Sequence, residues 1–161
     1  MLQERWWITL LRAGVLVLLA AAAGLAANAI RPNRIPWLGN WAHHAEARAL
    51  KEHIRLTSPA RARERLRAGG VVFLDARPAA DFARGRIQGA FSLPQAEIAE
   101  RFGEMQAWLD RGQEIVIYCS SAACDESLLV TLFLRSQGYT NLHLLMGGLA
   151  EWQTGGYPVE R

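Results

Sequence analysis

Residues 114–127 read EIVIYCSSAACDES, an apolar run followed by a loop of small residues that contains two cysteines. Four apolar residues follow Glu114, a pattern typical of a strand buried on both faces of a sheet. The strand delivers Cys119 at its carboxyl end, and the small residues 120–123 come next. A thiol in such a loop meets backbone N–H groups and the positive end of the following helix, and both favour the thiolate. We therefore predict a nucleophilic Cys119, with a buried structural cysteine as the competing interpretation.

The segments on either side of this strand alternate between strand and helix patterns. Short apolar runs predict further strands at residues 53–56, 71–75, 91–93 and 142–145. Helices are predicted after the N-cap Ser58 as far as the glycines at 69–70, at 95–108, from about 128 to Gly138, and around Trp152. Strands separated by helices imply an α/β fold with a parallel sheet covered on both faces. In such sheets chemistry takes place at the carboxyl ends of the strands, where Cys119 and Asp75 lie.

The first 30 residues are unlike the rest of the chain. Residues 13–30 carry no charge and would form a helix about 27 Å long, close to the ~30 Å hydrocarbon core of a bilayer. Tryptophans, which favour membrane interfaces, flank this run at Trp6, Trp7, Trp37 and Trp41. We predict a transmembrane helix or signal-anchor in residues 1–30. A cleaved signal peptide ending near Ala27-Asn28-Ala29 is the alternative.

Arginines lie on both sides of the predicted span, at Arg5, Arg12, Arg31, Arg34 and Arg48. They set its orientation only weakly. The short N-terminal tail and the signal-like run favour a single-pass membrane protein whose domain lies on the exported side, periplasmic or extracellular.

A linker or juxtamembrane segment, residues 31–52, joins the span to a domain at 53–161. Pro32 and Pro36 prevent the helix from continuing, and a short helix is predicted within 41–52. His43 and His44 are adjacent, so on a helix they point in different directions and do not form a metal site.

The composition of the 161 residues excludes several classes of protein. A hydrophobic share of 51% with 20% charged residues is close to globular averages, which argues against a disordered chain and a many-span transporter. The net charge is only +3, and 17 of the 18 basic residues are arginines, so no nucleic-acid partner is predicted. Two cysteines are too few for a disulfide scaffold. No metal and no cofactor are predicted.

The domain resembles the rhodanese-like sulfurtransferases in four blocks of sequence. Leu74-Asp75-Ala76-Arg77, with Phe82 and the residues GRIQGA at 85–90, is similar to the D-x-R…F…G-H-I-P-G-A signature of that family. Tyr118-Cys119 resembles its strand and catalytic cysteine. Met146-Gly147-Gly148, Trp152 and the residues GGYPV at 155–159 resemble its closing pattern. The resemblance implies a three-layer α/β/α fold with a five-stranded parallel sheet, and a persulfide on Cys119 as the intermediate.

The loop after Cys119 departs from the family pattern C-R-x-G-x-R-S. Both arginines are missing, and the loop is two residues longer if Ser127 is the matching serine. A substrate or anion loop is predicted from Ser120, Ser121, Ala122, Ala123, Asp125 and Ser127. Without the arginines an anionic donor such as thiosulfate would lose its cationic contacts. Related phosphatases need arginine where this chain has Asp125, which argues against phosphatase activity. Arg86 and Gln88 replace the family's histidine and proline, and we interpret both as changes to the scaffold.

Cys124 is the distinctive residue of the loop. It is a candidate redox partner that would resolve a persulfide or sulfenate on Cys119 as a disulfide. The alternative is a small apolar residue in the first turn of the next helix. Asp125 and Glu126 are predicted in that same turn, where they complement the helix dipole but make the field at Cys119 less positive.

Asp75, Arg77 and His143 are three further polar residues of the predicted domain. Asp75 and Arg77 are predicted to support the active-site mouth, with a structural ion pair as the alternative. His143 is interpreted as packed or hydrogen-bonded within the last strand rather than catalytic.

Two functional hypotheses follow from the sequence. The first is a membrane-tethered sulfurtransferase or thiol-redox enzyme that acts through Cys119 on a small sulfur-containing anion or a thiol acceptor. The second is a non-catalytic rhodanese-like module that binds a partner at the membrane. The intact Cys119 favours the first hypothesis, and the missing loop arginines favour the second.

Overall fold

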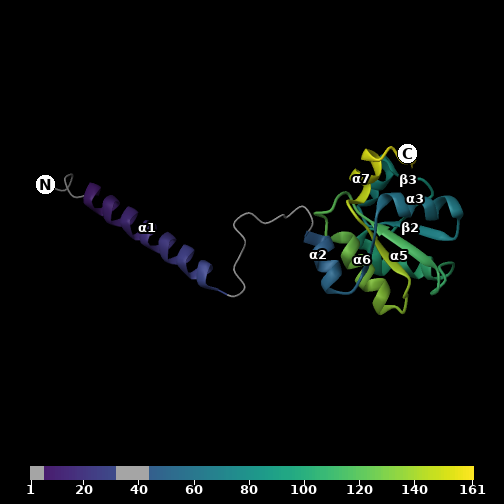
Figure 1. The fold of residues 1–161 in the computed structure, drawn as a ribbon, viewed down its shortest axis with the longest axis horizontal. Helices are drawn as coiled ribbons and strands as arrows, with labels where there is room; N and C mark the ends of the chain where they lie inside the picture. Colours follow the sequence, from purple (N-terminus) through teal and green to yellow (C-terminus); the bar gives the residue numbers. More distant parts are fainter. Residues whose placement is uncertain (1–5, 32–43) are drawn as a thin grey trace. The chain divides into compact units, whose positions relative to one another are not determined.

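The computed structural model describes residues 6–31 and 44–161 and divides the chain into two units, Met1–Gly39 and Asn40–Arg161. The first unit contains α1 (Trp6–Ile30), a helix of 25 residues in which no residue is buried (Figure 1). Of the helices in the described ranges, α1 alone is long and apolar enough to cross a bilayer, a property that a signal sequence shares. Other predictions for this region concern residues outside the described ranges: Arg5, Pro32, Arg34, Pro36, Trp37, Trp41 and His43.

A five-stranded sheet forms the centre of the second unit, in the order β1-β6-β5-β2-β4. Its strands are β1 (Arg55–Thr57), β2 (Val71–Asp75), β4 (Phe91–Ser92), β5 (Glu114–Tyr118) and β6 (Leu142–Leu145). Every neighbouring pair is parallel, with Val116 of β5 opposite Phe73 of β2 and His143 of β6. The predicted α/β fold with a five-stranded parallel sheet is confirmed. The strand that precedes Cys119 is its central strand.

The helices of this unit include every predicted helix, and the one predicted at 95–108 differs at both ends. They are α2 (His44–Lys51), α3 (Pro59–Ala68), α4 (Ala79–Arg84), α5 (Ile98–Gln106), α6 (Glu126–Ser136) and α7 (Gly148–Thr154). The Ser58 hydroxyl caps α3 by accepting a hydrogen bond from the Arg61 N–H at 3.4 Å, as predicted. The helix predicted at 95–108 instead opens with a 3₁₀ turn, η2 (Gln95–Glu97), and ends at Gln106.

The sequence patterns did not reveal α4 or a small antiparallel sheet of β3 (Arg86–Ile87) and β7 (Val159–Glu160). The Arg86 side chain donates to the Glu160 carboxylate at 2.9 Å and lies over the Phe82 ring, so it holds this small sheet in place. The first strand also begins later than predicted. His53 has a φ of 57°, in the left-handed region, and the chain turns there before β1 begins at Arg55.

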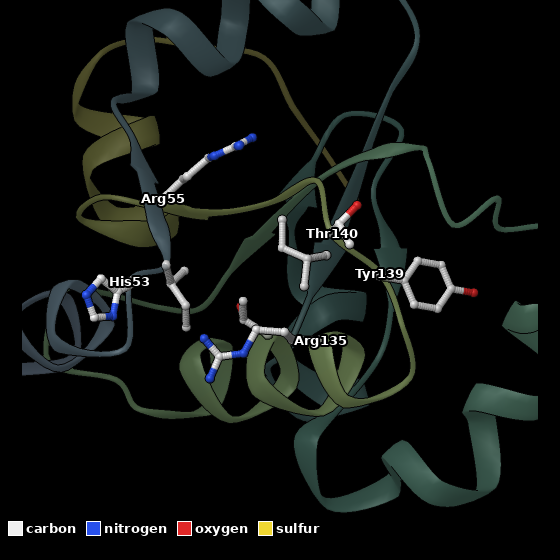
Figure 2. Close-up of a pocket in the computed structure, with 8 residues that line it drawn as sticks. His53, Arg55, Arg135, Tyr139 and Thr140 are labelled. Atoms are coloured by element: carbon white, nitrogen blue, oxygen red, sulfur yellow. The ribbon is translucent and has the colours of Figure 1, made fainter.

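The two ends of the sheet present different surroundings. At the amino end a cavity of about 260 Å³ lies beside Arg55 of β1 and Leu142 of β6 (Figure 2). The Arg135 guanidinium, which lines this cavity, donates to the carbonyl oxygen of Glu52 at 2.6 Å and to its carboxylate at 3.1 Å. Cys119 follows the opposite, carboxyl end of β5, so this cavity is separate from the cysteine loop.

Side chains of the sheet alternate between two buried clusters. On β5, Ile115 and Ile117 join the cluster that α5 and α6 complete, whereas Val116 and Tyr118 join the cluster beneath α3 and α7. This period of two is the pattern of a strand buried on both faces. Helices therefore cover both faces, and the predicted three layers are present.

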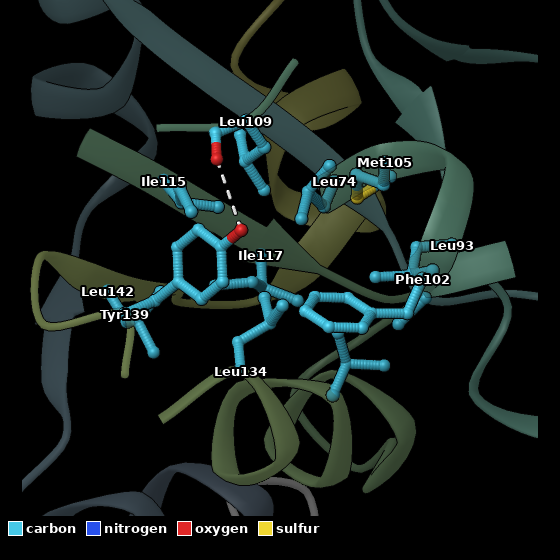
Figure 3. Packing of buried hydrophobic residues seen from close by; sticks show 12 residues of the cluster. Leu74, Leu93, Phe102, Met105, Leu109, Ile115, Ile117, Leu134, Tyr139 and Leu142 are labelled. Atoms are coloured by element: carbon cyan, nitrogen blue, oxygen red, sulfur yellow. Dashed lines mark hydrogen bonds between the residues drawn. The ribbon is translucent and has the colours of Figure 1, made fainter. Parts of the chain in front are cut away.

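The cluster beneath α5 and α6 holds the central strand from one side. Phe102 of α5 and Leu134 of α6 pack around Ile117, and the Tyr139 hydroxyl donates to the Leu109 carbonyl at 3.1 Å (Figure 3). Burial of apolar area at about 25 cal/mol per Å² is the main stabilising contribution of such a cluster. It fixes the carboxyl end of β5, from which the cysteine loop departs.

Candidate functional site

Cys119 lies directly after β5, and only 3% of its surface is exposed. Its carbonyl oxygen accepts a hydrogen bond from the Leu149 N–H at 2.8 Å, and the Ser120 carbonyl accepts one from Ala150 at 3.0 Å. Both donors belong to α7, which therefore begins against the cysteine loop. Gly148 permits this approach because a methyl group there would come within 2.5 Å of the Cys119 carbonyl oxygen.

The structure joins Cys119 and Cys124 in a disulfide whose Cα atoms are 6.2 Å apart. A turn between them, in which the Cys124 N–H donates to the Ser121 carbonyl at 3.3 Å, brings the second cysteine back toward the first. Cys124 precedes α6 and is not in its first turn, so the alternative placement within the helix is wrong. The Cα separation lies within the range that a disulfide between the two cysteines requires.

Glu126, the first residue of α6, points at both sulfurs. Its Oε2 lies 3.5 Å from Sγ of Cys119 and contacts Sγ of Cys124. The sequence indicated Glu126 only as a helix-start residue that weakens the positive field. Its direct contact with both sulfurs depends on the turn at 121–124, which the sequence did not reveal.

A cavity of about 150 Å³ adjoins this carboxylate at the carboxyl end of the sheet. It is formed by Ala76 and Pro78 after β2, by residues 94–97 after β4, and by Glu126. Glu97 is the second carboxylate in its wall and pairs with Arg101 at 2.5 Å. The mouth of the site therefore bears two acidic side chains. The sequence patterns did not indicate Pro78, Pro94 and Glu97 as site residues. The prolines that follow β2 and β4 do mark the loops in which they lie.

Asp75 and Arg77 form a buried ion pair behind the loop. The guanidinium donates to both carboxylate oxygens at 2.6–3.1 Å and to the Gly85 carbonyl at 2.7 Å. Burial lowers the pKa of Arg77, but the hydrogen bond and charge of Asp75 outweigh it and raise this pKa above its usual value. The pair thus connects β2 to the start of β3. Such an arrangement fits the alternative of a structural ion pair.

Tyr118 packs beside this pair at the end of β5. Burial and then the charge of Asp75 raise the pKa of the Tyr118 phenol. Its hydroxyl accepts a hydrogen bond from the Ile87 N–H at 3.1 Å. The phenol therefore stays protonated and fixes the strand end that carries Cys119.

The remaining predicted loop residues occupy different positions. Ser120, Ser121 and Ala123 are exposed, and Ala122 is half-buried. The Ser120 hydroxyl lies 3.8 Å from Sγ of Cys119. Ser127 is buried in α6, where its carbonyl accepts a hydrogen bond from the Thr131 hydroxyl at 2.7 Å. Ser127 is therefore part of the helix packing.

The Asp125 side chain is directed away from the two sulfurs. It occupies the N-cap position without a capping hydrogen bond, and its carboxylate pairs with Arg48 of α2 at 2.8 Å. His44 of α2 lies 3.7 Å from the same carboxylate. The prediction of Asp125 inside the first turn is therefore wrong by one position, because the side chain is held by α2 instead.

α2 also reaches the other side of the cysteine loop. The Glu46 carboxylate, 7% exposed, accepts a hydrogen bond from the Gly147 N–H at 2.8 Å. Gly147 precedes α7, whose first turn binds the Cys119 and Ser120 carbonyls. α2 thus holds both flanks of the cysteine loop. No sequence signal indicated this contact.

His143 lies on β6 away from this site. Its Nε2 is 3.2 Å from the Asn141 side-chain oxygen and 3.4 Å from the Glu114 carboxylate. Burial lowers its pKa, nearby Arg65 and Arg55 lower it further, and Glu114 opposes them. The residue is packed and hydrogen-bonded, as the sequence indicated.

Among the described residues, Cys119, Cys124 and Glu126 form a group whose possible metal-ligand atoms lie within 4.8 Å of one another. A metal of the zinc type needs thiolates from both cysteines. The disulfide occupies both sulfurs. The oxidised loop therefore supports sulfur redox chemistry rather than metal binding.

Comparison with known proteins gives consistent matches to this domain. The sequence is 33% identical over 103 residues to the thiosulfate sulfurtransferase GlpE of Actinobacillus succinogenes, covering 64% of this chain and 87% of the relative. It is 34% identical over 89 residues to a sulfurtransferase of Allochromatium vinosum, covering 55% and 78%. The solution structure of a rhodanese-like domain from Anabaena superposes with a TM-score of 0.56 at 28% identity, covering 65% of this chain and 77% of that domain.

The matched region contains every element that builds the site apart from α2. Residues 58–154 match the Rhodanese-like domain family. This range includes Asp75, Arg77, Cys119 and the start of α7. On this match and the agreement of the fold, the chain belongs to the rhodanese-like domain family.

Proposed function

We propose that this protein is a membrane-anchored sulfurtransferase that carries sulfane sulfur as a persulfide on Cys119, with Cys124 as its redox partner. The observation that carries the proposal is the position of Cys119 after the central strand, bonded to Cys124 and 3.5 Å from Glu126, which lines a cavity at the carboxyl end of the sheet. The sulfurtransferase relatives support the type of reaction.

The disulfide must open before Cys119 accepts sulfur. Two equivalents of an external thiol reduce it to two cysteine thiols and leave as one external disulfide. The Cys119 thiolate then attacks the outer sulfur of a donor R–S–SH. The S–S bond of the donor breaks, R–S⁻ leaves, and a persulfide remains on Cys119. A thiol acceptor takes the outer sulfur in the reverse manner.

The charge at the mouth suggests which donors are used. Glu97 and Glu126 line the cavity, and Arg77 is engaged by Asp75. A dianion such as thiosulfate would be repelled by the Glu126 carboxylate, whereas the charge of Glu97 is offset by Arg101. We therefore propose a hydropersulfide or another uncharged or cationic sulfane-sulfur compound as the donor, in preference to thiosulfate.

α1 is proposed as the membrane anchor, with the domain on the exported side. The support is its length, its apolar composition and the exposure of Trp6 and Trp7 at one end. An oxidising compartment outside the cytoplasm would favour the Cys119–Cys124 disulfide.

The second candidate function is a non-catalytic binding module at the membrane. The observation that favours it is the absence of both loop arginines between Cys119 and Ser127. A module of this kind would keep the fold and the buried Asp75–Arg77 pair without transferring sulfur.

Turnover measurements with the full-length chain in detergent distinguish the two candidates. The reduced protein receives a small alkyl hydropersulfide and a thiol acceptor, and transfer of sulfur to the acceptor is followed. We expect transfer by the wild type and background rates with Cys119→Ser. Equal rates for the two proteins would overturn the sulfurtransferase proposal and favour the binding module.

A further inference from the structure

We propose that Cys124 displaces sulfide from the Cys119 persulfide and that Glu126 is the acid–base group of this step. The inference rests on the proposed function, because it requires the persulfide, and it adds a second reaction: reductive release of sulfide. The residue assigned is one whose carboxylate contacts both reacting sulfurs.

The geometry selects Glu126 among the acidic residues near the loop. Its Oε2 lies 3.5 Å from Sγ of Cys119 and in contact with Sγ of Cys124. Asp125 is turned to Arg48 at 2.8 Å, and Glu97 is turned to Arg101 at 2.5 Å. Glu126 therefore has the reacting atoms as its neighbours, whereas the two other carboxylates have cations.

The electrostatics explain why a carboxylate at this place would act as a proton carrier. A negative charge beside a thiol opposes formation of a thiolate, so Glu126 does not activate Cys124 by stabilising its anion. It assists instead by accepting the thiol proton as the sulfur attacks. Proton transfer to a positioned side chain in this way is general base catalysis.

The reaction balances as follows. Cys124 attacks Sγ of Cys119 in the persulfide while its proton passes to the Glu126 carboxylate. The bond between the two cysteine sulfurs forms, the bond to the outer sulfur breaks, and the electron pair leaves with HS⁻. Glu126 returns the proton to give H₂S. The outer sulfur is reduced to sulfide, and the two cysteines are oxidised to the disulfide.

The charged groups around Glu126 come from three elements. The cysteine loop contributes Asp125 and the two cysteines. On α2, Arg48 and His44 lie beside Asp125, and Glu97 of η2 lines the same cavity as Glu126. Arg48 is paired with Asp125, and none of the ion pairs among the described residues includes Glu126. The proton carrier is thus not engaged by a described cation.

A single-turnover experiment on the reduced full-length chain tests the inference. One equivalent of a small alkyl hydropersulfide is added, and released sulfide is followed with time. We expect rapid release by the wild type, release slower by about 100-fold with Glu126→Gln, and partial recovery with Glu126→Asp. Glu100→Gln is the matched control, since Glu100 is an exposed first-turn glutamate of α5, and it should release sulfide as the wild type does.

The pH profile separates proton transfer from a structural effect. Without its base, the Glu126→Gln variant depends on the pre-formed thiolate of Cys124, so its rate should rise steeply with pH up to the thiol pKa. The wild type should show a weaker rise. Equal rates and equal profiles for wild type and Glu126→Gln would overturn the inference.

The Cys124→Ser variant distinguishes failure of the Glu126 inference from failure of the proposed function. It should hold the persulfide on Cys119 and release little sulfide. A persulfide on Cys124→Ser together with normal sulfide release by Glu126→Gln overturns the role of Glu126 alone. No persulfide on Cys124→Ser overturns the proposed function and, with it, this inference.

Discussion

The carboxylate of Glu46 accepts a hydrogen bond from the backbone N–H of Gly147 at 2.8 Å, and the two residues are 101 positions apart in the chain. This bond connects α2, at the start of the domain, to the turn that begins α7. Because α7 in turn binds the carbonyl of Cys119, a contact remote in sequence helps to position the cysteine loop.

Removing this contact should destabilise the domain. Glu46→Ala leaves a buried N–H of Gly147 without its acceptor, and the free energy of unfolding should fall by about 1–3 kcal/mol. Urea denaturation measures the change. Glu52→Ala is the control, because Glu52 forms an exposed ion pair with Arg135 and its loss should change stability by about 0–1 kcal/mol. Equal effects of the two substitutions would contradict the assigned role of Glu46.

The Asp75–Arg77 pair should be more sensitive still. Arg77→Met leaves the fully buried Asp75 carboxylate without its partner, and we expect a loss of about 3–5 kcal/mol in the free energy of unfolding. Arg84→Met removes an arginine from the exposed pair with Asp81 and provides the comparison. Denaturation midpoints that shift alike in the two variants would refute a buried structural pair.

The lowered pKa of His143 should make the stability of the domain depend on pH. Its pKa in the folded protein is lowered, first by burial, so the unfolded chain binds this proton more readily. The stabilising effect of the neutral form is present above about pH 6.5 and is lost as the pH falls toward the lower folded pKa. His143→Gln should therefore show a smaller loss of stability between about pH 7.5 and pH 5.5. A loss equal to that of the wild type would show that other groups cause the dependence.

α1 predicts how the full-length chain partitions in cells. An uncleaved anchor should keep the chain in the membrane fraction after an alkaline wash, and removal of residues 1–31 should release the domain. N-terminal sequencing of the mature chain provides the check on the alternative. A start near residue 30 would show a cleaved signal sequence and contradict the anchor.

The sequence predicted the central strand and the position of Cys119 because both depend on local patterns. A continuous apolar run defines β5, whose side chains are buried alternately on the two faces of the sheet. Such a strand can be predicted without reference to distant residues. The small residues after Cys119 likewise mark the loop. The fold followed from repeating this pattern along the chain.

The contacts that shape the site were not predictable in this way. The Glu46 bond joins residues at opposite ends of the domain, so no spacing reveals it. The direction of Glu126 depends on the turn that closes at Cys124, and β3 and β7 are each too short to give a periodic signal. The features that were not predicted therefore depend on contacts between distant residues or on strands of two residues.

The most direct test of sulfur transfer is the intact mass of the reduced full-length chain after addition of a small alkyl hydropersulfide. Cys124→Ser should gain the mass of one sulfur atom, and peptide mapping after alkylation should place that sulfur on Cys119. Cys119→Ser, treated alike, should gain none. An unchanged mass of Cys124→Ser, or equal gains by both variants, would contradict a persulfide carried by Cys119.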